Sequence, residues 1–274
     1  MRVLADLAEL RWGGAAVYWA VMGEPEFRRA LATDFNSLTP ENCLKMQTLR
    51  PARHRFDFSE ADRLVAFAAD HGMRVRGHTL VWHRQLPEWL TAEAMTGEEA
   101  RLFLKRHIYT VVGRYRDRID EWDVVNEAVK KDGSLRKTVW LETIGPEYIE
   151  LAFRWAHEAD PAAKLFYNDY AIAKGGPKAD AVFELLETLT AKGVPVHGIG
   201  FQSHFRTDLD LPWDRLPENF ERFRRLGVTD AASWIPHAFA DYDAGLLRDR
   251  DYLPKPVYRA VEEVLQESPG NAKP

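Results

Sequence analysis

The chain has 274 residues, of which 46% are hydrophobic and 29% are charged, and its formal net charge is −5. This balance predicts a soluble globular protein with a sizeable core and argues against a nucleic-acid partner, because nucleic-acid binders carry a basic face. Cys43 is the only cysteine, which excludes an intramolecular disulfide and a cysteine-based zinc site.

The N-terminal segment, MRVLADLAELRWGG, carries charges throughout. It therefore lacks the uninterrupted apolar core of a secretory signal. No apolar run is long enough to span a membrane, so we expect no membrane partner. The sequence as it stands predicts a cytoplasmic protein, or a secreted one if a targeting segment has been removed.

Short segments typical of β-strands alternate along the chain with longer amphipathic segments typical of helices. The predicted strands are GGAAVYWA from Gly13, DFNSLTPE from Asp34, RVRGHTLVW from Arg74, IDEWDVVNEA from Ile119, KLFYNDY from Lys164 and HGIGFQSHF from His197. The predicted helices between them include FSEADRLVAFAADHG, GEEARLFLKRHIYTVVGRYRD and ADAVFELLETLTAKG. This alternation predicts a parallel sheet with helices on it.

Several predicted helices have recognisable ends. Ser59 and Thr96 are suitable N-cap residues, and Gly72 and Gly193 follow the last turn of their helices. No low-complexity segment interrupts the pattern. We therefore expect a single domain over residues 1–267, followed by a polar tail at 268–274.

Polar residues gather at the carboxyl ends of the predicted strands. They are Glu41 and Asn42, His78 and Trp82, Asn126 and Glu127, Asn168 and Tyr170, and Gln202 and His204. In a parallel α/β barrel the loops at this end build the active site, whereas a doubly wound sheet binds ligands only at a switch point. Because nearly every strand contributes, we expect a closed barrel. No glycine-rich phosphate loop follows the first strand, which argues against a dinucleotide site.

Five motifs follow one another in order: FNSLTPENCLK, RGHTLVWHRQLPEWL, WDVVNEA, KLFYNDY and GIGFQSHF. Together they resemble family 10 of the glycoside hydrolases, the endo-1,4-β-xylanases, from about Leu7 to Tyr258. The resemblance implies a TIM-type (β/α)8 barrel, a β-1,4-linked xylan or xylooligosaccharide as the bound molecule, and no cofactor. Five motifs in the family's order make it specific, whereas any one of them would be weak.

The resemblance also implies a role for each motif residue. Glu127 resembles the general acid/base, and Asn126 resembles the neighbour that binds the 2-hydroxyl of the sugar at the cleavage point. The other residues implied in sugar binding are Glu41, Asn42 and Lys45 on the wall for non-reducing sugars, His78, Trp82 and Gln85 on the floor, Tyr170, Gln202 and His204 on the opposite wall, and Trp234 as a lid. Amide, carboxylate and flat aromatic groups of this kind suit the hydroxyls and ring faces of a neutral sugar chain.

Each of these residues also has a purely structural interpretation. Glu127 taken alone fits a strand-end carboxylate paired with Arg76 or His78 as well as it fits an acid catalyst, and the motif context favours catalysis. The histidines fit interior residues. Trp82 follows a strand directly and is the preferred sugar contact, whereas Trp122 is expected to pack in the core. No two histidines have a tight ligand spacing on one helix, so we predict no metal site.

The second carboxylate of a glycosidase is missing from the sequence. Retaining glycosidases need two carboxyl groups about 5 Å apart. In the family the nucleophile is a glutamate at the end of strand seven, in a motif like ITELD, and no such motif occurs here. LPENFERFRRLG resembles the helix before strand seven, and VTDAASWIP resembles the loop after strand eight. Strand seven, its helix and most of strand eight are therefore predicted to be deleted near Gly227.

Other acids are poorer substitutes for that nucleophile. Glu218 and Glu221 fall on the preceding helix, Asp208 and Asp210 in the loop after strand six, and Asp230 just after the junction. An inverting mechanism, with carboxyl groups about 6.5–9.5 Å apart, would use Asp208 or Asp230 to activate water. That geometry would have to arise by accident.

Two smaller departures from the family pattern border the expected sugar sites. The family often has tryptophan after the lysine of its ENxxK motif, where this chain has Met46 followed by Gln47. After the histidine of VWH the family usually has a small polar residue, where this chain has Arg84. Both changes predict a preference shifted away from plain xylan.

A barrel that lacks strands must close with fewer strands or leave open edges, which promote aggregation. Three accounts stay open: a natural or engineered contraction, a homodimer that covers the gap, or chemistry on another substrate that needs one acid/base. The first functional hypothesis is a xylanase-like glycoside hydrolase. The second is a non-hydrolytic descendant, either a sugar-binding protein or an enzyme that uses Glu127 for proton transfer on a non-sugar substrate.

Overall fold

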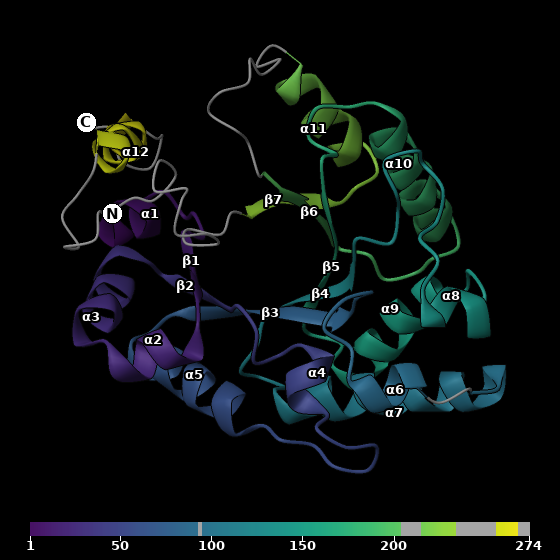
Figure 1. Ribbon diagram of the computed structural model, residues 1–274. Helices are drawn as coiled ribbons and strands as arrows, with labels where there is room; N and C mark the ends of the chain where they lie inside the picture. The colour runs from purple at the N-terminus through teal and green to yellow at the C-terminus, as the bar shows by residue number, and fades with distance from the viewer. Residues whose placement is uncertain (93–94, 204–214, 234–255, 268–274) are drawn as a thin grey trace. The chain divides into compact units, whose positions relative to one another are not determined.

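The computed structural model describes residues 1–92, 95–203, 215–233 and 256–267 (Figure 1). Contacts between Cα atoms divide the chain into two compact units. The first unit comprises residues 1–43, 59–76 and 235–274, and the second comprises residues 44–58 and 77–234. No helix in the described residues is both long enough and apolar enough to cross a membrane.

The first unit holds short parallel strands and the helices that pack on them. Its elements are α1 (Arg2–Leu7), β1 (Gly13–Ala16), α2 (Tyr18–Gly23), α3 (Pro25–Asp34), β2 (Ser37–Pro40), α5 (Ser59–Asp70), the start of β3 (Arg74–Val81) and α12 (Pro256–Glu267). β1 pairs in parallel with β2 from Gly13 opposite Ser37 to Ala16 opposite Pro40. The hydroxyl of Tyr258 on α12 donates a hydrogen bond to the buried carboxylate of Asp34 on α3, at 3.1 Å.

One predicted strand is shorter than expected. GGAAVYWA forms a strand only as far as Ala16, and Tyr18–Gly23 is helical. The Val-Tyr-Trp sequence favours a strand locally, but Ala20 and Val21 become buried when this segment coils. Tertiary packing therefore overrides the local β preference.

The second unit carries most of the parallel strands. Its elements are α4 (Met46–Leu49), the remainder of β3, α6 (Glu88–Ala92), α7 (Gly97–Arg114), β4 (Glu121–Asn126), α8 (Val139–Thr143), α9 (Tyr148–Ala159), β5 (Lys164–Tyr170), α10 (Pro177–Ala191), β6 (Gly198–Gln202), α11 (Leu216–Arg224) and β7 (Thr229–Ser233). β4, β5, β6 and β7 pair in parallel, each with the next along the chain. The predicted alternation of strands and helices is confirmed.

The helix ends follow the predicted chemistry. Thr96 caps α7 in a capping box, in which its hydroxyl accepts from the Glu99 N–H at 3.3 Å and the Glu99 carboxylate accepts from the Thr96 N–H at 2.8 Å. Gly72 and Gly193 follow α5 and α10 with φ of 59° and 64°, a conformation that glycine adopts at little cost.

The core of the second unit is filled by large side chains under the strands. Trp122 on β4 is fully buried, as predicted for a packing residue, and its ring lies where a Cβ at Gly77 on β3 would stand. Any larger residue at position 77 would clash with that ring. This close approach sets the neighbouring strands β3 and β4 together, and the Thr79 hydroxyl donates to the Asp123 carbonyl oxygen at 2.7 Å.

The structure corrects the prediction for the segment after Gly227. We expected VTDAASWIP to be a loop that follows strand eight, but Thr229–Ser233 is β7 and pairs with β6 from Gly198 opposite Thr229 to Gln202 opposite Ser233. Gly227, with φ of 76°, turns the chain after α11. The backbone of an unpaired β6 edge is thereby satisfied by the next segment available. The sequence of β7, TDAAS, contains no glutamate.

Candidate functional site

Glu127 stands directly after β4 and has a left-handed backbone, with φ of 58°. Its backbone N–H donates to the Asn168 carbonyl oxygen of β5 at 2.9 Å, at the level where Asn126 and Asn168 are opposite each other. Positive φ is uncommon for a residue other than glycine. The hydrogen bond to β5 therefore holds Glu127 in a backbone conformation that differs from the extended conformation of β4.

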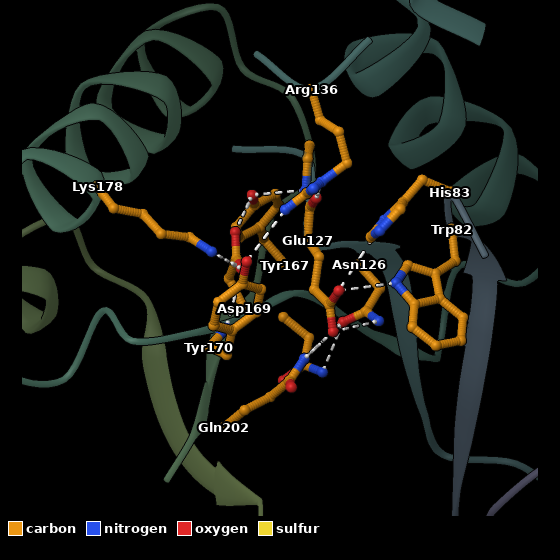
Figure 2. Close-up of polar contacts among 12 residues, drawn as sticks. Trp82, His83, Asn126, Glu127, Arg136, Tyr167, Asp169, Tyr170, Lys178 and Gln202 are labelled. Carbon is orange, nitrogen blue, oxygen red and sulfur yellow. Dashed lines mark hydrogen bonds and ion pairs between the residues drawn. The ribbon is translucent and has the colours of Figure 1, made fainter. Parts of the chain in front are cut away.

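Two side-chain donors from other strands of the sheet contact the Glu127 carboxylate (Figure 2). Trp82 Nε1, after β3, donates to Oε2 at 3.0 Å, and Gln202 Nε2, on β6, donates to Oε1 at 3.2 Å. The residue is only 9% exposed. The carboxyl group is thus fixed between two strands with one side left toward a cavity.

The amide of Asn126 connects β4 with β5 and β6. Its Oδ1 accepts from Asn168 Nδ2 and from Gln202 Nε2, both at 2.9 Å. Asn126 and Asn168 are 3% and 2% exposed. Gln202 therefore contacts both Asn126 and Glu127, and it fixes the Asn126 amide and the Glu127 carboxylate relative to each other.

Trp82 has a cation on its other side. Lys45 Nζ lies 4.8 Å from the centroid of the Trp82 ring. The ring centroid of His78 lies 6.4 Å from that of Trp82. The Nδ1 atom of His78 is 2.8 Å from a carboxylate oxygen of Asp123. The structural alternative in which His78 pairs with Glu127 is therefore wrong, because Asp123 is the acid that holds this histidine.

A buried polar group supports the backbone just after Glu127. The Ala128 N–H donates to the Tyr167 hydroxyl at 3.2 Å, and that hydroxyl donates to the Asp169 carboxylate at 2.7 Å. Lys178 on α10 lies 2.6 Å from the same carboxylate, with the two side chains 4% and 0% exposed. Burial raises the pKa of Asp169 to about 6, against the opposing effect of Lys178.

The chain after Glu127 forms a small hairpin. Val129 bridges Leu135 in antiparallel fashion, and the Arg136 N–H donates to the Ala128 carbonyl oxygen at 2.7 Å. The Arg136 guanidinium then donates to the Glu127 carbonyl oxygen at 3.0 Å and to the Tyr170 hydroxyl at 3.2 Å. Arg136 therefore ties the backbone of Glu127 to the end of β5.

A cavity of about 490 Å³ opens beside the Glu127 carboxylate. Its lining comes from the ends of β3, β4, β5 and β6 and the residues that follow them: His83, Arg84, Glu127, Lys131, Arg136, Tyr170, Ala171, Ala173, Lys174 and Gln202. Its size falls in the range of small-molecule sites. Glu127 is the only carboxylate among these residues.

His83 is a neutral wall of this cavity. Burial, together with the nearby Arg136 guanidinium, lowers the pKa of His83 to about 4. Its Nδ1 is 3.9 Å from Glu127 Oε2. At neutral pH this contact is not an ion pair, because the imidazole of His83 is then uncharged.

The other predicted site residues are distributed as follows. Glu41 and Asn42 follow β2 in the first unit, and the Glu41 N–H donates to the Ala16 carbonyl oxygen at 2.9 Å. Gln85 has φ of 48°, and its carbonyl oxygen accepts from the Gln47 N–H at 2.8 Å, but it does not line the cavity. His204 and Trp234 lie outside the described residues.

Sequence reasoning missed most of the charged lining. Lys131, Arg136 and Lys174 lie in loops with no motif, and only their closeness to strand ends could have signalled them. Arg84 was expected, as a departure from the family pattern, to shift the preference away from plain xylan, but not to be part of a basic lining. His83 adjoins Trp82 in the VWH motif, so the motif itself was the available signal.

No second carboxylate faces Glu127 among the residues that the structure describes. Glu218 and Glu221 lie on α11, in the helix predicted for them, and both are exposed. Asp208 and Asp210 fall in the undescribed stretch, and the side chain of Asp230 on β7 is likewise not described. Within the described chain no group of three or more His, Cys, Asp or Glu side chains is arranged to hold a metal ion.

Comparison with known proteins gives consistent matches. The model of glycosyl hydrolase family 10 matches residues 3–228. The endo-1,4-beta-xylanase B of Thermotoga neapolitana is 37% identical over 318 residues, which covers 97% of this chain and 92% of the relative. A beta-1,4-xylanase of Dictyoglomus thermophilum is 46% identical over 204 residues, which covers 74% of this chain and 57% of the relative.

The fold is matched by a solved structure as well. The crystal structure of xylanase 10B from Thermotoga petrophila RKU-1 in complex with xylobiose superposes with a TM-score of 0.91 at 38% identity, covering 97% of each chain. The predicted class, an incomplete TIM-type barrel, is confirmed. The alignment with the Thermotoga neapolitana xylanase extends over 318 positions although this chain has only 274 residues, and the family match ends at residue 228, beside Gly227. Both observations agree with the predicted deletion.

Proposed function

Because the chain belongs to glycosyl hydrolase family 10, we propose that it is an endo-1,4-β-xylanase-like hydrolase of xylooligosaccharides, in which Glu127 protonates the leaving oxygen. One observation carries the proposal. The Glu127 carboxylate lies on the wall of a cavity and accepts hydrogen bonds from Trp82 and Gln202, which come from two other strands. A fixed acid beside a space for a sugar is the geometry that general acid catalysis needs.

The neighbouring groups suit a neutral sugar chain. The Trp82 ring offers a flat apolar face, and Lys45 above it offers an ammonium donor for hydroxyls. The amides of Asn126 and Gln202 stand beside the carboxylate and can bind a hydroxyl of the sugar at the cleavage point. These residues together would orient the glycosidic oxygen toward Glu127.

The nucleophile is unassigned in this proposal. A retaining mechanism needs a carboxylate about 5 Å from Glu127 on the other face of the sugar. The single carboxylate in the described lining of the cavity therefore favours a second candidate function. In it the chain binds xylooligosaccharides through Trp82 and Lys45 without cleaving them, or uses Glu127 for proton transfer on another substrate.

The first experiment is a long incubation with xylohexaose in oxygen-18 water, read by mass spectrometry. It compares the wild type with Glu127→Gln, which keeps the shape of the side chain and removes the acid. Glu184→Gln on α10 is the matched control, because it makes the same change at an exposed position away from the cavity. Hydrolysis predicts labelled shorter sugars from the wild type and the control, and none from Glu127→Gln.

Intact xylohexaose in all three samples would refute hydrolysis of this substrate. A calorimetric titration with xylotetraose then separates the remaining alternatives. Binding that is lost in Trp82→Ala would identify the sugar-binding descendant. Absence of binding would leave proton-transfer chemistry on a non-sugar molecule as the role of Glu127.

A further inference from the structure

The cavity beside Glu127 is lined by more positive than negative charge. Among the residues that the structure describes, Arg84, Lys131, Arg136 and Lys174 line it, against the single carboxylate of Glu127. The whole chain has the opposite balance, with a net charge of −5. A concave, basic lining on an acidic protein concentrates a positive potential at that point.

The local fold explains why Asp132, the acid next to Lys131, does not neutralise this lining. Asp132 adjoins Lys131 in the hairpin, but its carboxylate accepts from the Ser134 N–H at 3.0 Å and lies 3.1 Å from Lys130 Nζ. Hydrogen bonds from Ser134 and Lys130 hold the pKa of Asp132 well below its usual range. The Asp132 carboxylate is therefore paired with Lys130 and Ser134 rather than with Lys131.

Of the four cations, Arg84 and Lys131 are available to a ligand, whereas Arg136 and Lys174 already have other interactions. Arg136 is committed to the Glu127 carbonyl oxygen and the Tyr170 hydroxyl. Arg84 and Lys131 are exposed at the rim, and within the described part of the chain neither forms an ion pair with a carboxylate. His83 in the same lining is neutral at neutral pH, since burial lowers its pKa to about 4.

The position of the cavity relative to Glu127 assigns it to the leaving group. This step rests on the proposed function, in which Glu127 gives its proton to the departing sugar. Lys45, which the family resemblance places on the wall for non-reducing sugars, does not line the cavity, and neither does Trp82. The sugar that departs would therefore occupy the space between Glu127, Tyr170 and the cations.

We propose that this cavity binds a carboxylate carried by the leaving part of a xylooligosaccharide, through Arg84 and Lys131. The guanidinium of Arg84 can hold a carboxylate with two parallel hydrogen bonds, and Lys131 adds a point charge. A sugar carboxylate has two chemical sources: a uronic acid attached as a branch, or an aldonic acid at an oxidised reducing end. The shared chemistry is one carboxylate next to neutral hydroxyls.

The test measures the affinity of the wild type for three ligands by isothermal titration calorimetry. They are xylotetraose, xylotetraose with a glucuronic-acid branch, and xylotetraonic acid. We expect one of the acidic ligands to bind roughly tenfold more tightly than xylotetraose, because both rim cations are partly hydrated. The acidic ligand that shows the preference identifies the source of the carboxylate. Added salt should weaken the preference.

Variants assign the effect to the two cations. Arg84→Gln with Lys131→Gln should bring the affinity for the acidic ligand down to that for xylotetraose. Lys137→Gln is the matched control, because this exposed lysine lies next to Arg136 and does not line the cavity. It should keep the full preference.

Equal affinity for all three ligands, or a preference that survives the double substitution, would overturn this inference. Absence of binding for every sugar would overturn it as well. The proposed hydrolysis is judged separately, by the xylohexaose experiment. A chain that prefers an acidic ligand but releases no labelled sugar would keep the carboxylate site and lose the hydrolase function.

Discussion

Two polar networks meet at Glu127, and they act on different parts of it. Trp82, after β3, and Gln202, on β6, contact its carboxylate beside the cavity. Tyr167, Asp169 and Lys178 are buried and hold the backbone at Ala128, and they also contact Tyr170 at the end of β5. The reactive group and its support are therefore separate, so substitutions should affect reaction rate and stability independently.

The largest expected effect comes from the buried network. Lys178→Met should lower the free energy of unfolding by about 3–5 kcal/mol, because Asp169 would be left buried without its partner. Urea unfolding measures this change. The control is Lys192→Met, which breaks the exposed contact of Lys192 with Glu150 and should cost at most about 1 kcal/mol. Similar losses for the two variants would show that the Lys178 pair gives no special support.

The carboxylate network should affect rate more than stability. Trp82→Phe keeps an aromatic face but removes the Nε1 donor to Glu127, so kcat/KM for xylohexaose should fall about tenfold to a hundredfold. Trp89→Phe is the control, because Trp89 Nε1 donates to the Arg50 carbonyl oxygen instead. It should reduce stability and leave kcat/KM unchanged. If both variants lost the same activity, the contact with Glu127 would have no particular role.

The carboxylate network is also the part that the sequence predicts best. In parallel strands the carboxyl ends meet, so motif residues at those ends, such as Glu127 and Gln202, were expected to come together, and they do. Their catalytic and sugar-binding roles stay predictions. The supporting network was not foreseen: Tyr167 and Asp169 lie within the KLFYNDY motif but were given no role, and Lys178 carries no motif and reaches Asp169 only because α10 folds beside β5.

The loops and the edge of the sheet were the least predictable regions. The hairpin that positions Lys131 and Arg136 is closed by backbone hydrogen bonds, which depend little on side-chain pattern. β7 was missed because the resemblance assigned its residues to a loop of a longer chain. Without the intervening residues, residues 229–233 pair with the open edge of β6 and form a strand.

The smallest expected effect links the carboxylate network to pH. Burial and Arg136 lower the pKa of His83 from 6.5 to about 4, so between these values the unfolded chain binds a proton that the folded chain does not. The contribution of His83 to stability is therefore present above pH 6.5 and is lost as the pH falls toward 4. Its slope should be below about 1.4 kcal/mol per pH unit, because water near the cavity screens the charge.

Urea unfolding at several pH values from 7 to 4 isolates this contribution as the difference between the wild type and His83→Gln. The difference should change steadily across that range in favour of the variant at low pH. His54→Gln removes an exposed imidazole and serves as the control for the loss of a histidine. Parallel curves for the wild type and His83→Gln would mean that the imidazole takes up its proton equally in both states. His83 could then no longer be treated as the neutral wall beside Glu127.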